Sequence, residues 1–94
     1  MRIEFRKSFE KSLKKANPKD KENVYEVCQA ILDVLEKQEQ PSQGMGLKKL
    51  EKTFWEIRVN IHVRIIFEWQ EDRIKFLLVG SHDEIKRFLK ENVS

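Results

Sequence analysis

The fold is decided by residues 54–89, which read FWEIRVNIHVRIIFEWQEDRIKFLLVGSHDEIKRFL. Apolar and polar side chains alternate over residues 55–59 and again over residues 62–69, which predicts two β-strands with one face buried. Residues 74–79 are more continuously apolar, as expected of a central strand. The end of this stretch predicts a helix, because Ser81 and Glu84 have the spacing of a capping box.

The turn between the first two strands is short, so they must form an antiparallel hairpin. Residues that face each other across such a pair share one side of the sheet, so buried positions must meet buried positions. The shortest loop that satisfies this rule pairs Val59 with Val63 and places Arg58 directly opposite Arg64. Like charges in facing positions destabilise a sheet by roughly a few tenths of a kcal/mol. We therefore expect an anionic ligand near these arginines, on the face turned away from the main core.

The N-terminal half predicts a short strand and two helices. Residues 2–6 alternate, and from residue 7 the apolar positions follow the spacing of an amphipathic helix. Asn17 and Pro18 are preferred residue types at the N-cap and first position of a helix, so a second helix should begin there and end near Gln38. Two helices joined this tightly form a hairpin that can cover one face of the sheet.

Residues 39–53 are expected to be a connecting loop, because proline, serine and glycine gather there. This stretch also contains three lysines, Lys48, Lys49 and Lys52. A solvated surface is the simple interpretation of these lysines, and a rim that binds RNA or a protein partner is the alternative. The predicted order is β-α-α-β-β-β-α, a single α+β domain over residues 1–94 with an antiparallel sheet packed against a helical hairpin and a C-terminal helix.

Composition limits the possible functions. The chain has 37% charged and 39% hydrophobic residues, which is typical of a globular protein, and its net charge of +3 permits an acidic partner such as RNA. The one cysteine, Cys28, excludes an intramolecular disulfide and predicts a buried, reduced thiol in a cytoplasmic protein. The N-terminus is too charged for a signal peptide, and no apolar stretch approaches membrane-spanning length. Ligand pairs typical of zinc sites are missing, so neither metal nor cofactor is expected.

Three side chains should converge on the exposed face of the sheet or at its edge: Arg58 and Arg64 across the hairpin, and His82 where the last strand ends. A helix N-terminus and two nearby cations both disfavour imidazolium, which predicts a neutral His82 able to accept a proton. Two guanidinium groups can hold a phosphodiester and stabilise the charge of its transition state. This combination favours cleavage of RNA by attack of its own 2′-OH, a reaction that DNA cannot undergo.

The same residues have a simpler structural interpretation. The two arginines are then solvated strand residues that pair with Glu56 and Glu68, and the histidine is an exposed residue of the first helical turn. His62 lies at the predicted hairpin tip, where a turn residue is the simple interpretation. A role as a catalytic acid is the alternative. Phe88 is most simply a core residue.

The segments WEIRVNIHVRIIFEW and VGSHDEIKRFL resemble the RelE/ParE superfamily of toxins from type II toxin–antitoxin systems. Motifs in the C-terminal half and the element order of the whole chain carry the resemblance, which implies a RelE-like fold. Toxins of the RelE branch of this superfamily cut mRNA in the ribosomal A site. The resemblance places Arg64 on the arginine that contacts the scissile phosphate and Arg58 on a basic strand residue. It places His82 where YafQ-like relatives have a histidine that suggests an acid or base.

Two positions depart from RelE itself. Glu56 stands in place of a lysine and Phe88 in place of a functional tyrosine, and both changes favour the histidine-dependent catalysis of YafQ-like members. The resemblance thus implies a metal-independent, ribosome-dependent mRNA endonuclease whose partners are mRNA on the ribosome, ribosomal RNA and a cognate antitoxin. Operator DNA would be reached only through the antitoxin. The alternatives are a ParE-like inhibitor of DNA gyrase and an inactive relative that acts as a binding module, between which the shared fold does not decide.

Overall fold

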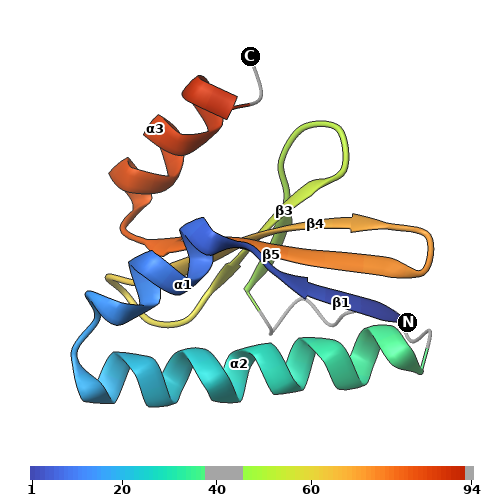
Figure 1. Ribbon diagram of the computed structural model, residues 1–94, viewed down its shortest axis with the longest axis horizontal. Helices are drawn as coiled ribbons and strands as arrows, with labels where there is room; N and C mark the ends of the chain where they lie inside the picture. The colour runs from blue at the N-terminus through green and yellow to red at the C-terminus, as the bar shows by residue number, and fades with distance from the viewer. Residues whose placement is uncertain (38–45, 93–94) are drawn as a thin grey trace.

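The computed structural model of the protein describes residues 1–37 and 46–92. A sheet forms the middle layer, with α2 along one face and α3 rising from the other (Figure 1). The elements in chain order are β1 (Arg2–Phe5), α1 (Lys7–Lys14), α2 (Pro18–Glu36), β2 (Leu47–Lys49), β3 (Phe54–Arg58), β4 (Arg64–Gln70), β5 (Arg73–Gly80) and α3 (His82–Asn92). The α+β architecture predicted from the sequence is confirmed.

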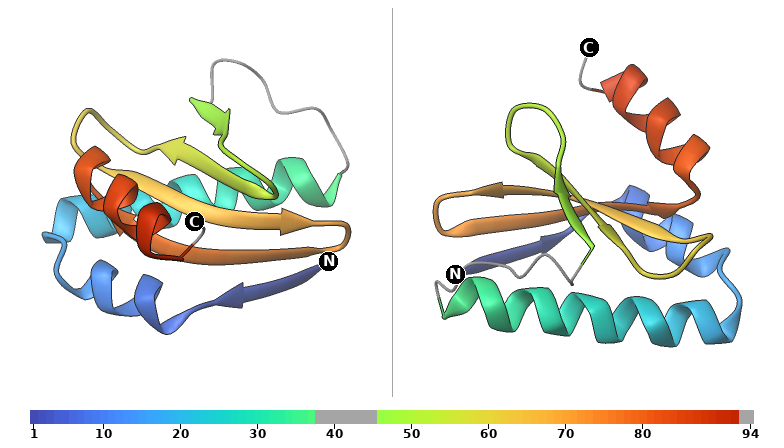
Figure 2. Two further views of the ribbon diagram at one scale, coloured as in Figure 1. Left: turned by 90° about the horizontal axis from the view of Figure 1, so that it is seen from above. Right: turned by 180° about the vertical axis from the view of Figure 1, so that it is seen from behind.

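The described strands form one sheet in the order β1-β5-β4-β3-β2, with β1 and β2 at its edges (Figure 2). Two expectations were wrong. β1 runs parallel to β5, so the sheet is not wholly antiparallel. Residues 47–49, expected to be loop, form β2 and pair antiparallel with β3. A short, lysine-containing strand is typical of a sheet edge, where charge discourages further pairing, and it has too few residues to show a period.

The expected helix start is confirmed at α2. The Asn17 side chain accepts a hydrogen bond from the Asp20 N–H at 2.8 Å, and Pro18 is the first helical residue. The helix ends at Glu36, close to the predicted end. Three of the residues that indicated a loop, Pro41, Ser42 and Gly44, lie outside the described residues.

The sheet is buried on both faces. The main core lies between the sheet and helices α1 and α2, and a second, smaller core of Ile66, Leu77 and Ile85 lies beneath α3. Trp55 and Trp69 pack against the main core, as predicted, with ring centroids 5.7 Å apart. Burial also raises the pKa of the Cys28 thiol to about 12, which keeps this cysteine protonated and unreactive. No helix of the described ranges is long and apolar enough to cross a membrane.

Helix α1 completes the edge of β5 where β1 ends. β1 pairs only with residues 73–76 of β5. Further along, the Ser8 hydroxyl donates to the Leu77 carbonyl, and the Ser12 hydroxyl accepts the Val79 N–H at 3.0 Å. Two serine side chains thus replace a neighbouring strand, and they fix α1 beside the end of β5 that leads to His82.

We expect Ser12→Ala to lower the free energy of unfolding by about 1–3 kcal/mol, because the partly buried N–H of Val79 loses its acceptor. Urea unfolding followed by tryptophan fluorescence measures the change. Ser12→Thr keeps the hydroxyl and should stay within about 0.5 kcal/mol of the wild type. Equal losses in both variants would show that the hydroxyl is not the stabilising group.

Candidate active site

Arg58 and Arg64 face each other across the β3–β4 hairpin, as predicted. The turn that sets this register is held by Asn60, whose side-chain oxygen accepts the N–H groups of His62 and Val63. On the other side of Arg58, Gly46 adopts a φ of +72°, and a Cβ there would lie only 3.3 Å from the Arg58 Cβ. The chain therefore passes close to Arg58 without covering it, and its side chain is exposed.

Arg64 is more enclosed than Arg58. Its Nη1 lies 3.7 Å from Oε1 of Glu56, and the two side chains are 18% and 10% exposed. The compensating interaction expected for this arginine is therefore present. Glu68 does not take part, because it pairs with Lys75 at 3.9 Å. Since a buried carboxylate is costly without a partner, Glu56 holds the guanidinium of Arg64 at this position on the sheet.

The row of residues across the sheet continues from Arg58 and Arg64 to Gly80, the last residue of β5. Adjacent strands lie about 4.8 Å apart, so this row brings the start of α3 to the arginines. His82 follows two residues after Gly80, as the exposed first residue of α3. No hydrogen bond or ion pair connects His82 to either arginine in the described structure. The imidazole is exposed, two residues beyond the end of the row that holds the two arginines.

The predicted capping box fixes the start of α3. The Glu84 N–H donates to the Ser81 hydroxyl at 3.2 Å, and the Ser81 N–H donates to the Glu84 carboxylate at 3.0 Å. The bond from the Ser81 backbone is the largest cause that lowers the pKa of Glu84, so this carboxylate stays ionised. Gly80 leaves room for the arrangement, because a Cβ there would meet the Glu84 Cβ at 3.1 Å. The helix that carries His82 thus starts from a rigid turn.

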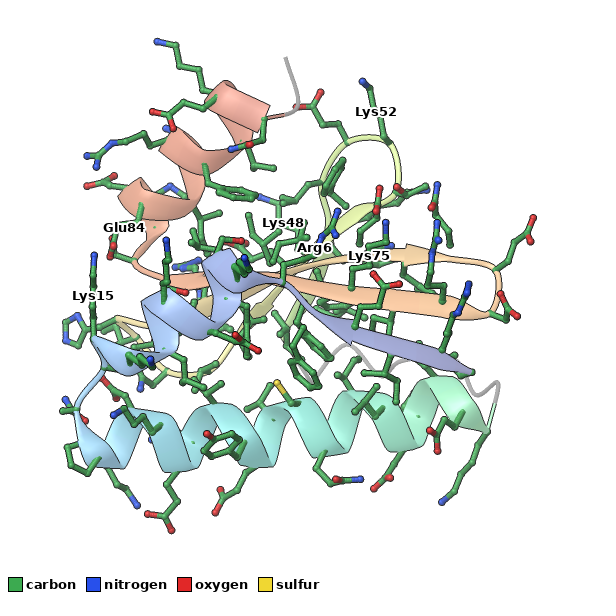
Figure 3. The ribbon with its side chains drawn as sticks, in the orientation of Figure 1. Arg6, Lys15, Lys48, Lys52, Lys75 and Glu84 are labelled. Carbon is green, nitrogen blue, oxygen red and sulfur yellow. The ribbon has the colours of Figure 1, made fainter. Side chains whose placement is uncertain are left out.

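The three lysines of residues 39–53 do not all point to the same face of the sheet. Lys48 shares the face of Glu56 and points to the α3 side of the sheet, and Lys52 lies at the tip of the β2–β3 loop (Figure 3). Lys49 shares the face of Trp55, with its Nζ 5.9 Å from the Trp55 ring centroid. Lys48 and Lys49 therefore point to opposite faces, because successive strand residues alternate, and a role of these lysines in binding RNA or a partner stays a prediction.

The remaining two candidates line separate cavities. Phe88 packs on the second core and lines a cavity of about 320 Å³ between α3 and the sheet, together with Arg6, Lys75 and Phe54. His62 is exposed at the hairpin tip and lines a cavity of about 460 Å³ beside α1. His62 is therefore not brought to the cavity of Phe88.

Sequence reasoning missed the residues that surround the His62 cavity. Lys11 and Lys15 of α1 line it, together with Gly80 and Ser81 from the turn before His82. The signal was present in the sequence, since five of residues 6–15 are lysine or arginine. The apolar positions predict this helix, and the charges lie on its opposite face.

The fold is similar to that of solved bacterial toxins. The chain is similar to a chain of the DinJ–YafQ complex of E. coli, with a TM-score of 0.69 and 19% identity over 90% of this chain and 98% of that one. It is also similar to a metal-bound toxin from Helicobacter pylori, with a TM-score of 0.65 and 19% identity over 90% and 98% of the two chains. The YoeB dimer from Staphylococcus aureus gives a TM-score of 0.63 and 18% identity over 87% and 97%.

These comparisons confirm the fold that the sequence motifs imply. No family model and no curated protein matches the chain in sequence. Within residues 1–37 and 46–92, no group of three or more histidine, cysteine or acidic side chains could hold a metal ion.

Proposed function

We propose that the protein is the toxin of a type II toxin–antitoxin pair and that it cleaves mRNA on the ribosome without a metal ion. The observation that carries this proposal is the row of Arg58, Arg64 and Gly80, with an accessible His82 two residues further on. Facing arginines are unfavourable in a sheet unless their charge is compensated. Glu56 pairs with Arg64, whereas Arg58 makes no ion pair within the described residues, so its charge is left for an external anion. A phosphodiester next to an imidazole fits this arrangement.

The chemistry follows from the residues. Arg64, oriented by Glu56, holds the scissile phosphate, and the exposed Arg58 stabilises the negative charge that grows on the phosphate oxygens. His82 takes the proton of the 2′-OH, and the 2′ oxygen forms a bond to phosphorus. The bond to the 5′ oxygen breaks, and His82 returns the proton to this leaving oxygen. The products are a 2′,3′-cyclic phosphate and a 5′-hydroxyl end.

The partners are proposed from the likeness of folds. YafQ of E. coli was solved in complex with DinJ, which supports a cognate antitoxin for this chain. The choice of translated mRNA, and of the cytoplasm as the place of action, follows the RelE branch that the sequence motifs resemble. A ParE-like inhibitor of gyrase is the second candidate, because a similar chain is described as a YoeB/ParE toxin from Agrobacterium tumefaciens.

Purified protein in a translation extract tests the proposal, with mapping of mRNA 5′ ends and a parallel assay of DNA supercoiling by gyrase. We expect cleavage that requires translation, persists with a metal chelator and leaves cyclic phosphate ends, while gyrase stays active. Inhibited supercoiling with intact mRNA would establish the ParE-like function instead. If mRNA stays intact and gyrase stays active, the remaining interpretation is an inactive relative that acts as a binding module.

A further inference from the structure

Helix α1 and its first flanking residue on either side carry more positive charge than the protein as a whole. Residues 6–15 hold five cations and one acid, a net charge of +4, whereas the whole chain has +3. We call four of them the α1 ridge: Lys7, Lys11, Lys14 and Lys15. They are exposed and lie within about 100° of one another around the helix, opposite the apolar face.

The helix dipole does not account for this pattern. Cations in the last turn of a helix are favourable, which suits Lys11 and Lys14. Lys7, however, occupies the first helical position, and the N-cap is Arg6, whose side chain makes no capping hydrogen bond. Cations at this end face the positive pole of the helix and are destabilising. A cause outside the helix is needed for basic residues at both ends.

Neighbouring side chains do not neutralise the ridge either. Lys7, Lys11 and Lys14 make no ion pair with any residue in the described ranges. Lys15 points from the end of α1 toward Glu84 (Figure 3), and its charge contributes to the lowered pKa of that carboxylate. A second acid near the ridge, Asp20, makes no ion pair with it within the described residues and accepts a hydrogen bond from the Asn60 side-chain amide at 3.1 Å. The ridge therefore keeps most of its charge available for an external anion.

The charge is also distributed unequally over the molecule. Helix α2 holds five acidic and two basic residues, a net charge of −3, so the rest of the chain carries +6. An anionic surface would repel the α2 side and attract the α1 side. Such an asymmetric field orients a protein as it approaches a large polyanion.

A bilayer is not a suitable partner for this ridge. The apolar side chains of α1, Phe9 and Leu13, are 3% and 9% exposed in the main core, so the helix has no apolar face to insert. Lys7, Lys11 and Lys15 follow one another at intervals of about 6 Å along the helix axis. This interval is comparable to that between successive phosphates of an RNA strand, and lysine contacts phosphate as a point charge.

We propose that the α1 ridge is a second RNA-binding surface, which binds the phosphate backbone of an RNA next to the cleavage site. Lys11 and Lys15 line the cavity whose wall includes Gly80 and Ser81, directly before His82. The ridge thus adjoins the candidate site and anchors the protein without taking part in the reaction. The choice of RNA as the polyanion rests on the proposed function. The RNA is either ribosomal RNA or the message itself.

The test compares two triple variants with the same change in net charge. The ridge variant is Lys7→Gln, Lys11→Gln and Lys15→Gln, and the control variant is Lys19→Gln, Lys21→Gln and Lys37→Gln on and beside α2. Binding is measured at several salt concentrations, with vacant ribosomes in one arm and a single-stranded mRNA fragment in the other. Urea unfolding of both variants confirms that they are folded.

We expect the slope of log affinity against log salt to become shallower by about 2 to 3 in the ridge variant, since three phosphate contacts are lost. The control should keep the wild-type slope. Loss in the ribosome arm identifies ribosomal RNA as the target, and loss in the fragment arm identifies the message. Equal behaviour of the two variants, or no RNA binding by the wild type, would overturn the proposal. Salt-dependent RNA binding without any cleavage would contradict the nuclease function, but it would still support the proposal that the α1 ridge binds RNA.

Discussion

Replacing His82 with alanine is expected to slow mRNA cleavage by roughly 10²–10⁴-fold, the usual contribution of a positioned acid–base group. The reason is chemical, because the proposed reaction assigns both proton transfers to His82, the first titratable residue after Gly80. The fold should not change, since His82 is exposed and the cap of α3 is formed by Ser81 and Glu84. Cleavage rates on programmed ribosomes, measured from the appearance of new 5′ ends, give the effect.

Two matched variants make this result specific. Asp83→Ala alters the next exposed residue of the same helical turn and should cleave at a rate close to that of the wild type. His62→Ala removes the other histidine, which lines the cavity beside α1, and should also have little effect. His82→Ala should still bind ribosomes. Wild-type cleavage by this variant, or an equal loss in His62→Ala, would refute the role of His82.

The register of the hairpin could be predicted from the sequence because two strong constraints act on it. A short turn limits the possible pairings, and burial of one face excludes every register that turns Ile57 toward solvent. Together they place Arg58 opposite Arg64, as the structure confirms. The capping box at Ser81 was predictable for a similar reason, since its two hydrogen bonds are local.

Other features depend on contacts that sequence spacing does not encode. The direction of β1 relative to β5 was not fixed by a hairpin, because two helices separate β1 from the other strands. β2 is only three residues long and pairs through Lys48 opposite Glu56, which no period reveals. The place of His62 beside α1 follows from how the hairpin tip packs on the helices, where Asn60 bonds to Asp20.

Arg64→Ala is expected to reduce cleavage by roughly 10²–10³-fold, because a preorganised donor to the transition-state charge is lost. It should also lower the free energy of unfolding by about 3 kcal/mol, since it leaves the buried carboxylate of Glu56 without its partner. Urea unfolding and the ribosome cleavage assay measure the two effects on the same preparation. Loss of activity alone is therefore ambiguous for this variant.

The double variant Glu56→Gln, Arg64→Ala separates the two effects, because it removes the orphaned charge along with its partner. We expect stability to return most of the way to the wild-type value while cleavage stays low, since the phosphate has lost its guanidinium. Arg64→Lys keeps the charge next to Glu56 but not the two-pronged geometry, so it should be stable and only partly active. If the double variant recovered cleavage together with stability, Arg64 would serve only to neutralise Glu56, and the phosphate would have to be held by Arg58 alone.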